Sequence, residues 1–236
     1  LASVLYKNTE KQVKVAAINA LGVLYVVEIG DAVQSIEDLK GQTLVSTGKG
    51  TTPEYALNHV LLKNGIDPAA DLTIEYKSES TEVAAALAGG TATLAMLPQP
   101  YVAVVQAQNP DVRVALSLTD EWAKADDGSA LVTGVAVIRS AFIDEHPDLV
   151  ASFLAEYAAS AEYVNANPAE AALWIADLGI VPKAEIAQAA IPLSNIVCIT
   201  GDDMKARLSG YLAALCEQNP AAVGGELPDD AFYYLT

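Results

Sequence analysis

The sequence predicts an α/β protein, and three observations support this fold class. Between Gly41 and Ser117, short β-branched or apolar runs alternate with segments of helical periodicity, as in parallel strands joined by crossover helices. After a further strand at Gly134–Ile138, nearly all of the chain follows a helical period. Hydrophobic residues make up 52% of the chain and charged residues 18%, so a large core can be buried. The length of 236 residues allows one large domain or two lobes.

The first part of the chain has a helical period at Leu1–Tyr6, followed by two apolar runs. These runs, Val13–Ile18 and Val23–Glu28, predict two strands or one long bent strand. In the middle of the chain, strands and helices alternate in units of ordinary crossover length. The predicted strands are Thr43–Ser46, Leu72–Tyr76, Thr93–Leu97 and Val112–Leu118, and the predicted helices are Pro53–Lys63, Glu79–Ala88 and Pro100–Gln108.

The last part of the chain is predicted to be mainly helical. A long helix at His146–Asn165 directs an apolar stripe, which includes Leu149 and Phe153, toward a core. Two capping patterns, which begin at Asn167 and Thr200, then start two more helices. These helices are Ala171–Leu178 and Met204–Glu217.

The charge of the chain limits its partners. Thirteen basic and thirty acidic residues give a formal charge of −17. This charge repels phosphate backbones and anionic lipid heads over distances comparable to the Debye length. Nucleic acid and membrane surfaces are therefore not expected as partners. No apolar run in the sequence approaches the roughly 18 residues that a membrane-spanning helix needs.

The residues that carry metal or nucleophilic chemistry are sparse. The two cysteines, Cys198 and Cys216, form no C-x-x-C motif and no Cys/His cluster, so we expect no metal and no cofactor. They are either a disulfide or, as the more ordinary interpretation, two free thiols. The histidines, His59 and His146, lie near no G-x-S-x-G nucleophile turn, and no catalytic residue is assigned.

The segment from Ser46 to Thr52 is the main candidate for a binding site. It joins a strand to a helix that starts at Pro53, and its glycines let the backbone turn tightly and approach a ligand. The free amides and the positive end of the helix dipole favour an anion or a polar oxygen. The alternative is an ordinary strand-to-helix turn that Thr52 caps. The candidate ligand-binding residues are Ser46, Thr47, Gly48, Lys49, Gly50, Thr51 and Thr52.

Three further candidates follow other predicted strands. Gln99 and Tyr101 lie at the carboxyl end of a strand, the edge where open α/β sheets bind ligands. Gln99 can donate and accept hydrogen bonds, and Tyr101 can stack or donate. Alternatively, the neighbouring prolines only shape the connection and Tyr101 packs inward. Trp122 is placed either to cover a ligand or, as the favoured alternative, to plug the lobe junction.

Several segments taken together resemble one protein family. The run Asp38-Leu39-Lys40-Gly41, followed by a strand and a Gly/Thr loop, is the most specific part of this resemblance. The family is that of the substrate-binding proteins of ABC transporters of the nitrate, sulfonate and thiamine-precursor type. The resemblance extends over essentially the whole chain. The segments that carry it are Asn19–Tyr25, Asp38–Thr43, Ser46–Glu54, Ala95–Pro100 and Pro228–Tyr234.

The resemblance implies a type II periplasmic-binding fold, in which two parallel-sheet lobes joined by a hinge close over a small polar or anionic solute. It implies a membrane permease as partner. It also implies an extracytoplasmic location, in the periplasm or lipid-anchored at the outer face of the cell membrane. Residues 31–117 would form one α/β lobe, and residues 1–30 and 118–236 a partial, helix-rich lobe. The positions carried over are Asn19 and Leu21 at the hinge, and Thr47–Thr52, Gln99 and Tyr101 in the cleft.

The start of the chain departs from the family pattern. Members begin with about two strand-and-helix units, on the order of 70 residues, which this sequence lacks. We therefore expect an incomplete first lobe, which would come from a truncated gene, a shortened expressed chain or proteolysis. Open sheet edges in such a lobe would favour self-association.

Two other functions are compatible with the same fold. The effector-sensing domain of a transcription regulator would need a helix-turn-helix segment, and an enzyme of thiamine-pyrimidine synthesis would need a cysteine cluster and a sacrificial histidine. Neither motif occurs in the sequence. Lys49 is the only base in the two candidate loops, so a neutral heterocycle stays open as ligand beside an anion.

Overall fold

The chain folds into two compact units in the structure, a computed structural model that describes residues 1–126 and 128–235. The first unit comprises Leu1–Leu21, Asp127–Ala166 and Asn195–Thr236. The second unit comprises Gly22–Asp126 and Asn167–Ser194. Each unit has its own sheet, with helices packed on it.

The second unit is larger than the lobe of residues 31–117 expected from the sequence. Strand β2 (Leu24–Ile29) belongs to its sheet because β2 pairs with both β5 (Leu94–Pro98) and β6 (Val112–Ser117). Residues 167–194 also belong to this unit, since one of their helices packs on a helix that follows β5. The boundary is thus set by strand pairing and helix packing between segments that are distant in the sequence.

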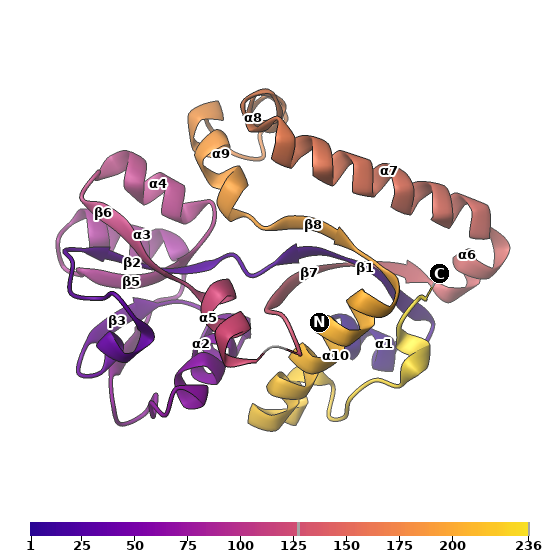
Figure 1. The fold of residues 1–236 in the computed structure, drawn as a ribbon, viewed down its shortest axis with the longest axis horizontal. Coiled ribbons are helices and arrows are strands. Elements are labelled where there is room, and N and C mark those ends of the chain that lie inside the picture. The colour runs from indigo at the N-terminus through magenta and orange to yellow at the C-terminus, as the bar shows by residue number, and fades with distance from the viewer. Residues whose placement is uncertain (127, 236) are drawn as a thin grey trace. The chain divides into compact units, whose positions relative to one another are not determined.

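The described residues of the second unit form a five-stranded sheet in the order β4-β3-β5-β2-β6, of which β3, β5, β2 and β6 are labelled in Figure 1. Strand β3 (Thr43–Ser46) pairs in parallel with β4 (Thr73–Tyr76) and with β5, which confirms the predicted crossover units. Strand β2 runs antiparallel to β5 and β6, so the other four strands share one direction. The carboxyl ends of β3, β4 and β5 therefore lie at one edge of the sheet, where the candidate loops begin.

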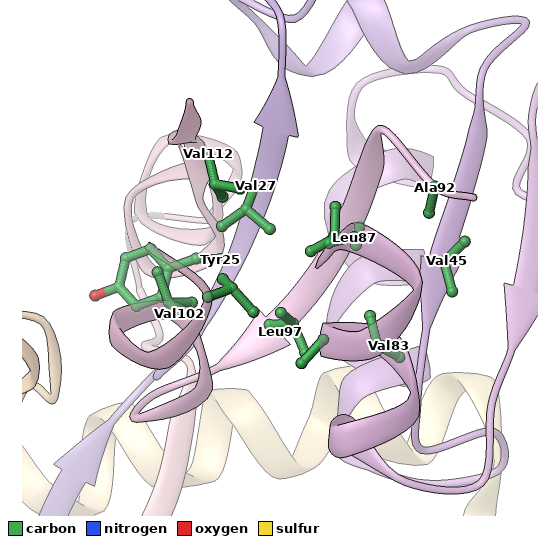
Figure 2. Close-up of a cluster of buried hydrophobic side chains, with 12 residues drawn as sticks. Tyr25, Val27, Val45, Val83, Leu87, Ala92, Leu97, Val102 and Val112 are labelled. Carbon is green, nitrogen blue, oxygen red and sulfur yellow. The ribbon is translucent and has the colours of Figure 1, made fainter. Parts of the chain in front are cut away.

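Helices cover this sheet on both faces. The helices of this unit are α2 (Thr52–Lys63), α3 (Ser80–Ala88), α4 (Tyr101–Gln108), α5 (Leu118–Ala125), α8 (Pro168–Asp177) and α9 (Ala184–Ala190), with the 3-10 turns η1 (Ile36–Leu39) and η2 (Ile191–Leu193). Helix α9 packs on α4, and α8 packs on α9. On one face, Val45 of β3 packs in a cluster with Val83 of α3 and Val102 of α4 (Figure 2). The adjacent residue, Leu44, points to the opposite face and is also fully buried. Burial on both faces explains why these strands have almost continuous apolar sequences.

The described residues of the first unit form a three-stranded sheet in the order β7-β1-β8. The central strand β1 (Val13–Leu21) runs antiparallel to both β7 (Val132–Arg139) and β8 (Ile196–Ile199). The expectation of a parallel sheet is therefore wrong for this unit. Strand direction depends on how the chain returns from the second unit, and local periodicity does not encode this path.

Helix packing in the first unit also differs from the prediction. Its helices are α1 (Ala2–Asn8), α6 (Ser140–Glu145), α7 (Pro147–Ala166) and α10 (Gly201–Gln218), with the 3-10 turns η3 (Pro220–Val223) and η4 (Asp230–Phe232). Val150 and Leu154 of α7 are buried, whereas Leu149 and Phe153 are 58% and 47% exposed. The expected core position of Leu149 and Phe153 is wrong because adjacent helix positions point about 100° apart, and the buried stripe is narrow.

Candidate functional site

The loop between β3 and α2 makes a tight turn that depends on its glycines. Gly48 and Gly50 both have left-handed backbone conformations, with φ of 76° and 75°. The Thr51 hydroxyl donates a 2.6 Å hydrogen bond to the carbonyl of Gly48. A Cβ atom added to Gly48 would lie 2.7 Å from Pro53 Cγ, so the position admits only glycine without movement of the loop. The predicted close backbone turn is therefore present.

The cap of helix α2 differs from both sequence interpretations. The N-cap residue is Thr51 rather than Thr52, and its side chain makes no capping hydrogen bond. Instead, the Glu54 carboxylate accepts a hydrogen bond from the backbone amide of Gly50. The Gly50 amide is thus already bound by a side chain of the same chain, which corrects the expectation that the amides of this loop are free.

Tyr76, at the end of β4, lies beside this loop. It is the register partner of Ser46 across the parallel β3–β4 pair, so the two side chains share one face of the sheet. Lys49 Nζ lies 5.7 Å from the centroid of the Tyr76 ring, within cation–π range. Burial raises the pKa of the Tyr76 phenol above its usual range, and the negative charge of nearby Glu54 raises it further.

Sequence reasoning missed Glu54 and Tyr76. Both were within predicted elements, and Tyr76 was the last residue of a predicted strand, which is a position where ligands bind in open α/β sheets. This rule could have selected Tyr76 directly. Glu54 could have been found as an acid in the first turn of a helix that follows a glycine-containing loop.

The connection from β5 to α4 places Gln99 in a constrained backbone. The Gln99 amide donates to the carbonyl of Val23 at 3.0 Å, and Gln99 Oε1 accepts from the amide of Ala103 at 3.3 Å. Gln99 Nε2 is buried and has no hydrogen-bond partner among the described residues. Tyr101 packs against the core cluster of the unit, in agreement with the inward-packing alternative. Gln99 is therefore the stronger candidate of this pair.

Trp122 lies in the core of the second unit. The residue is fully buried on α5, and its indole stacks on the His59 ring of α2, with centroids 4.0 Å apart and planes 20° from parallel. His59 Nε2 is 3.9 Å from a carboxylate oxygen of Asp126. Trp122 thus packs α5 onto α2, and its burial argues against the candidate role of covering a ligand, which was the less favoured of the two interpretations.

The two remaining candidates, Asn19 and Leu21, belong to the first unit. Both lie on β1, whereas the loop residues and Gln99 belong to the second unit. Asn19 Oδ1 is close to the backbone of β7, since a Cβ at Gly134 would lie 2.3 Å from it. Leu21 is held through its backbone, which donates to Asn195 at 3.1 Å and accepts from the hydroxyl of Thr133. Asn19 and Leu21 thus belong to a different unit from the other predicted site residues, of which the loop residues and Gln99 follow β3 and β5 of one sheet.

The remaining candidates for chemistry are metal-ligating side chains and the two cysteines. Among residues 1–126 and 128–235, no group of three or more His, Cys, Asp and Glu side chains is arranged to hold a metal ion. No helix within those ranges has the length and apolar character needed to cross a membrane. Cys198 and Cys216 are free thiols, and burial raises the pKa of Cys198. The β3–α2 loop, Tyr76 and Gln99 thus follow or end neighbouring parallel strands, at the carboxyl edge of the sheet.

Two α/β units, one of which carries polar loops at the carboxyl edge of its parallel strands, are the arrangement of the two-lobed periplasmic-binding fold. Residues 6–171, more than half of the chain, match the NMT1/THI5-like family. The chain belongs to this family. A comparison with curated protein sequences finds no match.

Solved structures share the fold at low sequence identity. An ABC transporter structure from Parabacteroides distasonis has a TM-score of 0.79 and 24% identity, covering 99% of this chain and 77% of that one. The periplasmic aliphatic sulphonate binding protein SsuA from Escherichia coli has a TM-score of 0.70 and 13% identity, covering 99% and 73%. A DszB mutant in complex with biphenyl-2-sulfinic acid has a TM-score of 0.55 and 15% identity, covering 94% and 78%. At these identities the structures establish the fold.

Proposed function

We propose that this protein is an extracytoplasmic solute-binding protein, which binds a small polar solute and delivers it to an ABC-transporter permease. The family and the fold support this role, because several neighbours are described as ABC-transporter or sulfonate-binding proteins. The observation that carries the proposal is the glycine-dependent β3–α2 loop at the carboxyl edge of a parallel sheet.

The second unit supplies the groups that such a role requires. Ser46 is almost fully buried at the end of β3, Tyr76 is its partner on β4, and Gln99 follows β5. Hydroxyl and amide groups on a rigid sheet edge can orient a solute with little loss of conformational freedom on binding. We assign the loop from Ser46 to Thr52, together with Gln99, to solute contact. Asn19 and Leu21 remain candidates that rest on the family resemblance.

Binding without turnover distinguishes this role from an enzymatic one. Incubation of the protein with any bound solute, followed by mass spectrometry, should recover the solute unchanged. Conversion of the solute would contradict the transport role and favour an enzyme with this fold, of which the DszB neighbour would then be the nearer comparison. The regulator alternative would instead require an encoded DNA-binding helix pair.

Thermal unfolding in the presence of a panel of solutes tests the proposal. A ligand that binds the folded state stabilises it by RT ln(1 + [L]/Kd), which is about 2.7 kcal/mol at a concentration of 100 Kd. We expect at least one polar solute among sulfonates, inorganic oxyanions, carboxamides and aminopyrimidines to raise Tm. If no solute in the panel shifts the transition, the proposed function is contradicted.

A further inference from the structure

A carboxylate from the first turn of α2 binds the loop that precedes this helix. Glu54 lies in the first turn of α2, and its side chain reaches back to accept a hydrogen bond from the amide of Gly50. An anionic ligand at a helix start normally makes this kind of contact with a loop amide. Here the position is filled from within the chain. A second anion would compete with Glu54 for the same amide.

Lys49, the base within this loop, does not remove the repulsion between Glu54 and an anionic ligand. Lys49 lies over the ring of Tyr76, so its charge is directed at that ring. One lysine and one glutamate leave the segment from Ser46 to Glu54 without net charge. A ligand anion would therefore approach a carboxylate at short range, and two like charges within about 4–6 Å disfavour each other.

The remaining polar groups suit a ligand of a different kind. Glu54 is a hydrogen-bond acceptor, so it can bind an N–H or O–H donor of a solute in addition to Gly50. Gln99 Nε2, which follows β5 at the same edge of the sheet, is a buried donor without a partner among the described residues, so it can donate to an acceptor atom of a solute. A carboxamide, an amidine or an amino-substituted heterocycle offers a donor, an acceptor or both.

We propose that Glu54 sets the charge selectivity of the solute site, so that it takes uncharged or cationic solutes with N–H or O–H donors and rejects anions such as sulfonates. This inference rests on the proposed function, since it concerns the same loop. It separates the present chain from those neighbours that are described as sulfonate-binding proteins.

Three benzene derivatives that differ in charge test the selectivity of the site. Calorimetric titration with benzamide, benzamidine and benzenesulfonate compares a neutral, a cationic and an anionic solute. The wild-type protein should bind benzamide or benzamidine at least about tenfold more tightly than benzenesulfonate. Glu54→Gln, which keeps an oxygen for the Gly50 amide and removes the charge, should change this ratio by at least about tenfold in favour of benzenesulfonate.

Asp71→Asn provides the matched control. Asp71 also accepts a backbone hydrogen bond from a residue four positions earlier, Asp67, at 2.8 Å, but it precedes β4 and lies at the opposite edge of the sheet. This variant removes the same charge and should keep the wild-type preference. Circular dichroism and Tm of all variants establish that they are folded. Glu54→Asp, which retains the charge, should also keep the preference for benzamide or benzamidine.

The outcomes separate this inference from the proposed function. If the wild type binds benzenesulfonate as tightly as the other two compounds, or if Glu54→Gln leaves the ratio unchanged, the inference is overturned while solute binding stands. It is also possible to compare charges when none of the three compounds binds but another solute of the thermal-unfolding panel does. Binding of an anion would then overturn the inference, and binding of a neutral or cationic solute would support it. If nothing binds the wild type, the proposed function fails, and the inference fails with it.

Discussion

Strands β2 and β5 of the second unit are buried along most of their length, whereas β7 and β8 of the first unit are partly exposed along most of theirs. Helix α7 of the first unit buries Val150, Leu154 and Ala161 and leaves Leu149 and Phe153 exposed. Apolar area removed from water is the main favourable term in folding. The comparison therefore indicates that β2 and β5 contribute more buried apolar area to their core than β7 and β8 contribute to theirs.

The largest expected effect on stability comes from shortening a buried side chain in the core of the second unit. Leu97→Ala in β5 removes a fully buried side chain, and we expect a loss of about 2–5 kcal/mol in the free energy of unfolding. Leu149→Ala makes the same chemical change in the first unit at a side chain that is 58% exposed, and should cost less than about 1 kcal/mol. Urea denaturation of both variants measures the difference. Equal losses would contradict the difference in burial between the two side chains.

The sequence predicted the second unit well because its signals are local. Strand β3 was predicted with its exact ends, and helices α2 and α4 to within one residue, because turn residues bound each apolar run. Helix α5 was missed, although Ser117, whose Oγ accepts from the amide of Asp120 at 3.3 Å, gave a usable cap signal. Its only large apolar residues are Leu118 and Trp122, and two such positions are too few to show a period.

Features that depend on contacts between distant segments could not be read from the sequence. The stacking of Trp122 on His59 joins two helices that are about sixty positions apart along the chain. The proximity of Tyr76 to Ser46 depends on the β3–β4 register, and the antiparallel sheet of the first unit depends on the path of the whole chain. The β3–α2 loop was predicted, and the contact of Glu54 with the Gly50 amide was missed although it spans only four positions.

Two glycines at the two ends of helix α2 allow the role of the β3–α2 loop in solute binding to be separated from its role in stability. Gly48 and Gly65 both have positive φ, at 76° and 68°, but only at Gly48 would an added Cβ meet other atoms within 4 Å. Gly65 follows the far end of α2. Each substitution by alanine should cost about 1–2 kcal/mol of stability because of the left-handed backbone. Gly48→Ala should in addition weaken solute binding by at least about tenfold, since it displaces the loop.

Calorimetric titration of both glycine variants with the solute that stabilises the wild type checks this prediction. Gly65→Ala controls for the loss of stability, because it has the same backbone cost without a clash at the loop. Equal affinity of the two variants would show that the solute does not contact the β3–α2 loop.

The smallest expected effect concerns a polar cluster of the first unit, where Tyr6 and Lys11 both donate hydrogen bonds to the Asp229 carboxylate. Burial, together with the hydrogen bond and charge of Asp229, raises the pKa of Tyr6 to about 12. A raised pKa in the folded state means that the stabilisation is complete below the unfolded value near 10 and is lost as pH rises toward 12. Lys11, whose pKa Asp229 also raises, acts in the same direction.

Tyr6→Phe should therefore cost about 1 kcal/mol or less at pH 7, where the hydrogen bond is lost, and should make the alkaline decline in stability shallower. Because Asp229 accepts from Lys11 and Tyr6, its pKa is lowered, so its contribution is present at neutral pH and is lost as pH falls into the acid range. Asp229→Asn should accordingly be less sensitive to acid than the wild type. Urea midpoints measured from pH 3 to pH 11 test both slopes, and parallel profiles for the wild type and Tyr6→Phe would exclude the phenol as a source of the alkaline decline.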